Sequence, residues 1–179
     1  MPRCVALLRG INVGRHQRLA MADLRELLTN LGYSDVKTHL QSGNALLTSG
    51  STGSDKIAGA IEKAIARDLR LQVKVLVRSE AELAEVVAGN PLADVATDGA
   101  RYLVAFLSAA PDRDRLAAVD PDTFAPEQFR AGRRELYLWY PNGVHQSKMS
   151  NSFWEKQLAV TATSRNWNTV TRLLELAGS

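Results

Sequence analysis

Three polar segments of the chain combine positive charge with small hydrogen-bonding residues, which is the chemistry of an anion-binding site. The first, RGINVG at residues 9–14, contains two glycines and the side chains of Arg9 and Asn12. Glycine lets backbone amides approach a ligand closely, and such amides beside a guanidinium can bind an anion. The glycine spacing fits neither a dinucleotide fingerprint nor a P-loop. A structural turn with a surface arginine is the alternative interpretation.

The second segment, QSGN at residues 41–44, has the composition of a hairpin turn. In the functional interpretation, the Ser42 hydroxyl and the Asn44 amide orient a ligand at the edge of a sheet. Nothing nearby in the sequence makes Ser42 a nucleophile, so a general base would have to come from one of the three histidines elsewhere in the fold. An ordinary turn is the alternative.

The third segment, TSRNWNT at residues 163–169, is predicted to begin the last helix, with a threonine or serine as its N-cap. A helix N-terminus attracts anions, and Arg165 would add a full positive charge there. Asparagine is a poor residue inside a helix, so Asn166 and Asn168 indicate hydrogen bonding, either to a ligand or within the protein.

These segments together define the predicted ligand-binding set. Lys148, in the loop before the third segment, could add a second positive charge to it. The set is Arg9, Asn12, Ser42, Asn44, Lys148, Arg165, Asn166, Asn168 and Thr169. No catalytic residue can be named from the sequence. No grouping of His, Cys, Asp or Glu has the spacing of a metal site, so neither a metal nor a cofactor is expected.

The elements that would carry the first two segments follow a β-α-β-β-α-β order over residues 1–78. Apolar runs predict strands, and apolar residues at three- and four-residue spacing predict helices. The expected elements are a strand at 4–9, a helix at about 21–31, strands at 36–40 and 45–49, a helix at about 54–69 capped by Ser54, and a strand near 73–77. This is the order of a ferredoxin-like unit, with two helices on one face of an antiparallel sheet.

Residues 79–179 predict a second, related α+β subdomain. Ser79 and Glu82 have capping-box spacing, so a linking helix is expected at about 79–89. After it we expect a strand at 102–107, a short helix at 111–119, strands at 124–130 and 135–140, a loop at 141–150, and two C-terminal helices near 151–159 and 165–177. The sequence leaves the strand order open, and the two subdomains could pack as one globular unit.

The composition is typical of a folded protein. The 179 residues are 45% hydrophobic and 23% charged, with a formal net charge of +3, which is enough apolar residue for a packed core. No apolar run reaches the roughly 18 residues of a bilayer span, so no membrane partner is expected. The single cysteine excludes an internal disulfide, and a reducing cytoplasm is the expected compartment.

The polar segments also occur in a fixed order with other short motifs. That order is ALLRGINVG at 6–14, Met21 and Leu24, LQSGN at 40–44, Asn90-Pro91, Ser147-Lys148 and residues 163–170. In this ordered set, which covers nearly the whole chain, the sequence resembles the bacterial domain-of-unknown-function family 1697. The resemblance implies a cytoplasmic α+β protein with ferredoxin-like architecture, and it implies no activity. The chain departs from the family pattern at Arg15, His39 and Ser164.

The function that these features favour is binding of a small anionic or phosphate-bearing molecule in a polar cleft. Lys148 and Arg165 would stabilise negative charge, but whether the protein is an enzyme stays open. Nucleic-acid-backbone binding is one alternative, because residues 1–19 contain four arginines and no acid. The strands lack the aromatic residues on which an RRM stacks bases. A regulatory or self-association module is the other alternative, and ligand identity and oligomeric state are left open.

Overall fold

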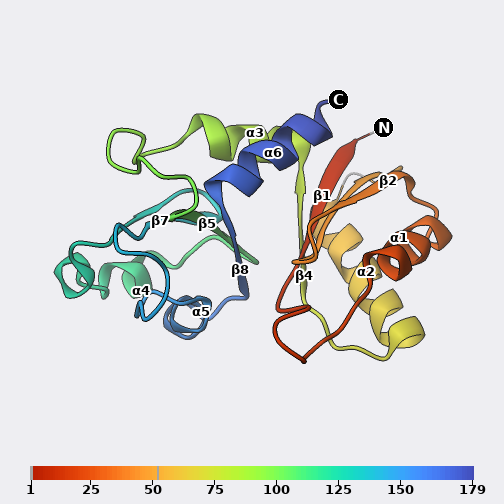
Figure 1. Cartoon of the computed structure of the whole chain (residues 1–179), viewed down its shortest axis with the longest axis horizontal. Helices are drawn as coiled ribbons and strands as arrows, with labels where there is room; N and C mark the ends of the chain where they lie inside the picture. Colours follow the sequence, from red (N-terminus) through yellow and green to blue (C-terminus); the bar gives the residue numbers. More distant parts are fainter. Residues whose placement is uncertain (1, 52) are drawn as a thin grey trace. The chain divides into compact units, whose positions relative to one another are not determined.

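Strands and helices alternate along the chain in two units, each built around one antiparallel sheet (Figure 1). The computed structural model describes residues 2–51 and 53–179. The first unit runs to Ala84 and includes Leu173–Ser179, and the second is Glu85–Arg172. The sequence-based boundary at 78/79 lies six residues before this division, which falls inside a helix. Among the described residues, none of the helices combines the length and apolar character that a bilayer crossing requires.

Unit 1 has the predicted β-α-β-β-α-β order. Its elements are β1 (Arg3–Leu8), α1 (Met21–Asn30), β2 (Ser34–His39), β3 (Asn44–Thr48), α2 (Ser54–Leu69) and β4 (Val75–Ser79). The sheet order is β2-β3-β1-β4, and β1 runs antiparallel to both β3 and β4. Both helices lie on one side of this sheet (Figure 1). The expected α+β class with a ferredoxin-like first unit is therefore confirmed.

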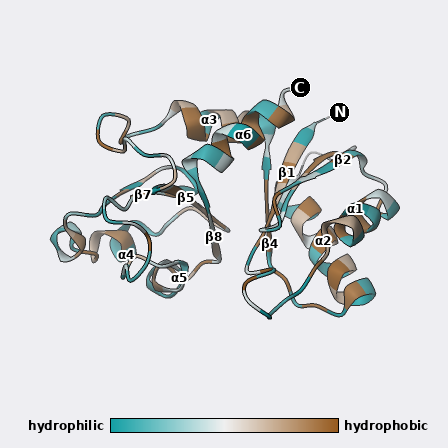
Figure 2. Ribbon diagram, viewed as in Figure 1, coloured by the Kyte–Doolittle hydropathy of each residue, from teal (hydrophilic) through white to brown (hydrophobic). Residues whose placement is uncertain are grey.

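The core of unit 1 lies between its sheet and these two helices. Alternate β1 residues, Cys4, Ala6 and Leu8, join the buried cluster because successive strand side chains point to opposite faces. From the helices, residues such as Leu24 and Ile61 enter the same cluster, each with no exposed surface. Burying one such side chain stabilises the fold by about 1.5–3 kcal/mol. Hydrophobic and hydrophilic stretches accordingly alternate along α1 and α2 (Figure 2).

Unit 2 repeats this topology. Its elements are β5 (Tyr102–Leu107), α4 (Arg113–Ala117), the 3₁₀ turn η1 (Pro121–Phe124), β6 (Gln128–Ala131), β7 (Glu135–Trp139), α5 (Asn151–Leu158) and β8 (Ala162–Asn166). The sheet order β6-β7-β5-β8 corresponds strand for strand to that of unit 1. Register agrees as well: β1 pairs Val5 with Arg78 of β4, and β5 pairs Val104 with Arg165 of β8. The second subdomain is thus the related α+β unit that the sequence predicted, with its strand order now defined.

Two predicted boundaries in this unit are wrong. The last helix, α6 (Trp167–Ala177), begins two residues later than expected, because residues 162–166 form strand β8 along β5. The strand expected from residue 124 begins at Gln128, because Asp120 caps a 3₁₀ turn that ends at Phe124. Pairing with the distant strand β5 extends the strand conformation to Asn166, and capping by Asp120 replaces the expected start of the strand with a 3₁₀ turn.

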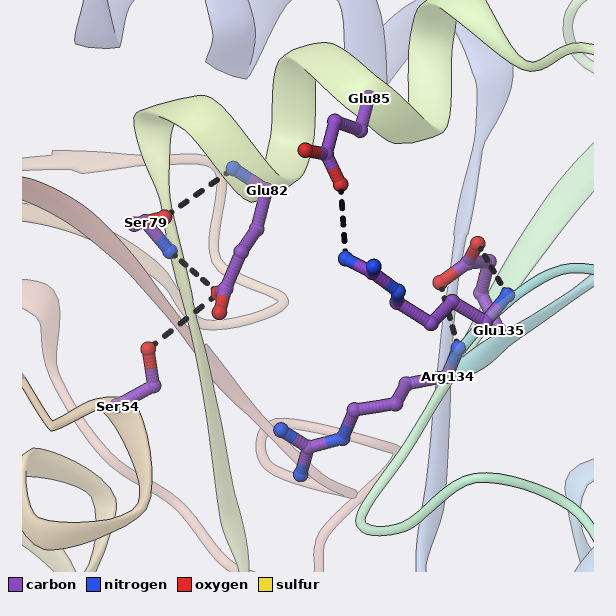
Figure 3. Close-up of polar contacts among 7 residues, drawn as sticks. Ser54, Ser79, Glu82, Glu85, Arg134 and Glu135 are labelled. Carbon is purple, nitrogen blue, oxygen red and sulfur yellow. Dashed lines mark hydrogen bonds and ion pairs between the residues drawn. The ribbon is translucent and has the colours of Figure 1, made fainter.

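Helix α3 (Glu80–Ala88) begins with the predicted capping box. The Glu82 amide donates to Ser79 Oγ at 3.1 Å, and the Ser79 amide donates to Glu82 Oε2 at 2.8 Å. The Ser54 hydroxyl also donates to Glu82 Oε2, at 3.3 Å, as Figure 3 shows. The prediction that Ser54 caps α2 is wrong. Ser54 is the first residue of α2, and the N-cap is Gly53.

Candidate functional site

A polar cleft of about 330 Å³ opens in unit 2 between two segments that flank the strand pair β6–β7. One wall is residues 123–127, at the end of η1 and before β6. The other wall is residues 142–148, in the loop between β7 and α5. The polar side chains that line the cleft are those of Thr123, Glu127, Asn142, His145, Gln146, Ser147 and Lys148. Because β6 and β7 pair antiparallel, the segments before β6 and after β7 are brought to the same end of the sheet.

The second wall is a loop held by turns and by one buried anchor. The Gly143 amide donates to the Tyr140 carbonyl at 2.9 Å, and Gly143 has the positive φ of 90° that this turn requires. Beyond the turn, Met149 is 1% exposed and its carbonyl accepts the Tyr140 hydroxyl at 2.6 Å. Burial raises the pKa of Tyr140, and the Glu127 charge raises it further. The loop thus presents its polar side chains from a fixed base.

A hydrogen bond joins the two walls. The Ser147 hydroxyl donates to Glu127 Oε1 at 2.8 Å, and Ser147 Oγ accepts the Met149 amide at 3.0 Å. The Glu127 amide in turn donates to the Phe124 carbonyl at 2.8 Å. Phe124 is 7% exposed and packs edge-on against Phe153 of α5, so the first wall rests on the aromatic core of unit 2. Glu127 itself is half-buried.

The charges of the cleft have both signs. Lys148 and His145 are exposed on the loop, and Glu127 faces them from the other wall of the same cleft. An ammonium and an imidazole can bind an anionic group, and the amide and hydroxyl groups of Asn142 and Thr123 can orient it. Ser147 also lines a smaller cavity of about 130 Å³ together with Ser164 of β8.

Arg165 does not lie where the sequence predicted. It is a residue of strand β8 and not of a helix N-terminus, and it is 8% exposed. Its Nη1 donates to Thr163 Oγ1 at 2.8 Å and to the Ser164 carbonyl at 2.9 Å. Burial lowers the pKa of the guanidinium to about 10. Both of these hydrogen bonds join the buried guanidinium to residues of its own strand.

The other members of the third segment start helix α6. Asn166 Oδ1 accepts the Thr169 amide at 2.9 Å, which is the bond of an N-cap. Thr169 is 9% exposed, whereas Asn168 is exposed in the first helical turn. The two asparagines therefore differ: Asn166 caps the helix, and Asn168 is exposed with its side-chain amide beside Gly99.

In unit 1 the first two segments lie side by side. The Asn12 side-chain amide donates to the carbonyls of Leu19, at 2.9 Å, and of Gln41, at 2.7 Å, and its Oδ1 accepts the Leu19 amide at 2.9 Å. Asn12 has a φ of 55°, a conformation that asparagine tolerates better than most residues. Asn12 thus joins the loop after β1 to the β2–β3 hairpin, as a structural turn requires.

Asn44, Ser42 and Arg9 complete this group. The buried Asn44 amide donates to the His39 carbonyl at 2.7 Å and to Ser42 Oγ at 3.2 Å. Arg9 is half-buried, and its backbone amide donates to the Lys74 carbonyl at 2.9 Å. Ser42 is exposed beside the hairpin. The structure thus brings Asn12, Ser42 and Asn44 together in unit 1, whereas Lys148 lies in the cleft of unit 2.

Sequence reasoning missed Glu127, Thr123 and Asn142 as cleft residues and considered His145 only as one of three histidines. The turn residues Pro126 and Gly143 lie in the two walls, but nothing in the sequence shows that these walls meet. Within the described ranges, no three His, Cys, Asp or Glu side chains gather as a metal site would require.

Comparison with known proteins places the chain among conserved proteins without an assigned activity. A family model described as "Protein of unknown function (DUF1697)" matches residues 1–137. A solved structure, that of the conserved bacterial protein SP0830 from Streptococcus pneumoniae, is similar with a TM-score of 0.75 and 22% sequence identity over 98% of each chain. At this identity the likeness shows the fold alone. No curated protein matches the chain.

Proposed function

This chain belongs to the DUF1697 family of proteins of unknown function, which implies no activity, and we propose from the cleft of unit 2 that this unit binds a small anionic molecule, a carboxylate or a phosphate ester. The observation that carries the proposal is the cleft of about 330 Å³ whose loop wall presents Lys148 and His145. This volume lies at the lower end of the usual range for small-molecule sites.

The rigidity of the loop wall supports binding. The turn at Gly143, the buried Met149 and the bond between Ser147 and Glu127 restrain the wall before any ligand arrives. A site whose side chains are already positioned loses less conformational entropy when a ligand binds. Lys148 supplies the full positive charge, and the neutral polar side chains of the cleft supply orientation.

The test is calorimetric titration with inorganic phosphate, ethyl phosphate and succinate. We expect at least one of them to bind, and we expect Lys148→Ala to weaken that binding about tenfold or more, since a charged hydrogen bond contributes about 1.5–3 kcal/mol. Lys156→Ala is the matched control, because Lys156 is exposed on the neighbouring helix α5 and does not line the cleft. Equal affinities of the two variants, or no binding by the wild-type protein, would reject the proposal.

A second candidate function, binding to the nucleic-acid backbone, is favoured by the loop after β1 in unit 1. Arg15 and Arg18 are exposed there, and neither forms an ion pair with another described residue. The loop is held by Asn12 and by the Gln17 side-chain amide, which donates to the Gln72 carbonyl at 2.8 Å. Exposed arginines on a restrained loop can contact phosphates without reading sequence.

Binding of labelled single- and double-stranded oligonucleotides over a salt series tests this candidate. Each phosphate contact contributes about 0.9 to the slope of log K against log salt on a duplex, so the double variant Arg15→Ala/Arg18→Ala is expected to lower the slope by about two. The variant Arg113→Ala/Arg115→Ala removes the same charge from exposed positions on α4 and serves as control. If both double variants weaken binding equally, the net charge of the protein explains the binding, and the loop after β1 is not a specific contact surface.

A further inference from the structure

We infer that the ligand of the unit 2 cleft carries, beside its anionic group, a hydroxyl or ammonium group that donates a hydrogen bond to Glu127. The inference rests on the proposed anion site at Lys148 and adds a second recognition element to it. The ligand class is therefore small anions that also carry a hydrogen-bond donor, such as phosphorylated amino alcohols and phosphorylated polyols. Simple anions without a donor are not the preferred ligands.

The first support is the unused acceptor capacity of Glu127. An ionised carboxylate has about four acceptor sites. Within the described part of the chain, its carboxylate accepts one side-chain hydrogen bond, from Ser147 to Oε1. Half-buried carboxylate oxygens are stabilised by donors, and the cleft that Glu127 lines is where a ligand would supply one. A hydroxyl or an ammonium is such a donor.

The second support is the fixed position of that carboxylate. Ser147 Oγ accepts the Met149 amide, so its own hydrogen is directed to Glu127. Met149 is buried, which ties this arrangement to the core of unit 2. The remaining oxygen of Glu127 is therefore a positioned acceptor and not the end of a freely moving surface side chain. Positioned acceptors discriminate between ligands that do and do not carry the matching donor.

The third support is the separation of charge within one small cleft. Lys148 follows Ser147 directly in the sequence, so the loop that presents the positive charge also holds the negative one in place on the opposite wall. Glu127 repels a ligand that carries negative charge alone, because like charges held in one small cleft interact unfavourably. A ligand with a donor next to its anionic group converts that repulsion into an attraction.

Three phosphate monoesters of the same chain length test the inference by calorimetric titration: ethyl phosphate, 2-hydroxyethyl phosphate and phosphoethanolamine. They differ only in a terminal methyl, hydroxymethyl or aminomethyl group. We expect the wild-type protein to bind at least one of the two donor-bearing esters about tenfold tighter than ethyl phosphate. Glu127→Ala removes the acceptor, and it is expected to remove most of this preference and to leave ethyl phosphate binding unchanged or stronger. Glu26→Ala, an exposed change on α1, controls for the loss of one negative charge.

The outcomes separate this inference from the proposed function. Equal wild-type affinity for all three esters, with weakening in Lys148→Ala, overturns the inference and keeps the anion site. A preference that persists undiminished in Glu127→Ala also overturns it, because another group then accepts the donor. If none of the esters binds, the inference fails, and the proposed anion site fails with it unless inorganic phosphate or succinate binds. Should Glu127→Ala fold poorly by circular dichroism, Ser147→Ala releases the carboxylate instead, and the preference is then expected to fall.

Discussion

Gly43 joins the two candidate segments of unit 1, and replacing it with alanine should be costly. Gly43 lies in the β2–β3 hairpin with a φ of 93°, and an added Cβ would lie 2.7 Å from Ile11 Cδ1 and 2.9 Å from Leu8 Cβ. Gly32 in the same unit has a φ of 95°, and a Cβ there would meet nothing within 4 Å. The pair therefore shares the backbone strain and differs in packing.

The magnitudes follow from these two contributions. The left-handed conformation costs an alanine about 1–2 kcal/mol, and the loss of unfolded-state freedom returns about 0.4–1 kcal/mol, so Gly32→Ala should destabilise the protein by about 1 kcal/mol. Gly43→Ala adds overpacking against Ile11 and Leu8, which costs about 1–3 kcal/mol more. We therefore expect Gly43→Ala to lower the free energy of unfolding by about 2–4 kcal/mol.

Urea denaturation followed by circular dichroism measures both variants, with the wild-type protein as reference. The slope against denaturant must stay constant for the midpoints to be compared as stability changes. If Gly43→Ala and Gly32→Ala lose the same stability, the close packing of the hairpin on Ile11 does not exist in solution. The interpretation of residues 9–14 and 41–44 as one packed structural pair would then be wrong.

Two further predictions concern groups that the structure places in internal contacts. Asn12→Ala removes three hydrogen bonds to backbone groups of Leu19 and Gln41, so we expect a loss of about 2–4 kcal/mol in urea denaturation; unchanged stability would return Asn12 to the set of free ligand-binding side chains. Burial raises the pKa values of Tyr102, Tyr137 and Tyr140 above their ordinary value of 10.0. Their contribution to stability is therefore fully present below pH 10 and is lost as the pH rises further, so tyrosinate absorbance should appear together with unfolding. Ionisation of all tyrosines near pH 10 in the folded protein would contradict this.

Local patterns in the sequence predicted the order of elements in unit 1 and most of the elements of unit 2. Apolar spacing located α1 and α2, and the Ser79–Glu82 spacing predicted the capping box that begins α3. These features depend on residues within one or two helical turns of each other, so a short stretch of sequence is enough to predict them. Strand β8 was missed because its sequence, ATSRN, lacks apolar alternation, and its pairing with β5 overrides the weak helical preference.

The candidate site shows the same division. Charge and loop position identified Lys148 from the sequence, but Glu127 is 20 residues from its partner Ser147, and only the pairing of β6 with β7 brings them together. The roles of Asn12, Asn166 and Arg165 were likewise decided by partners that folding supplies: backbone groups for the asparagines, and a buried strand position for the arginine. The sequence by itself determined which side chains are polar, charged or apolar, and so the order of elements. Tertiary structure decided which polar groups are used within the protein and which face a cleft, because hydrogen bonds between distant segments form only when the chain brings them within about 3 Å.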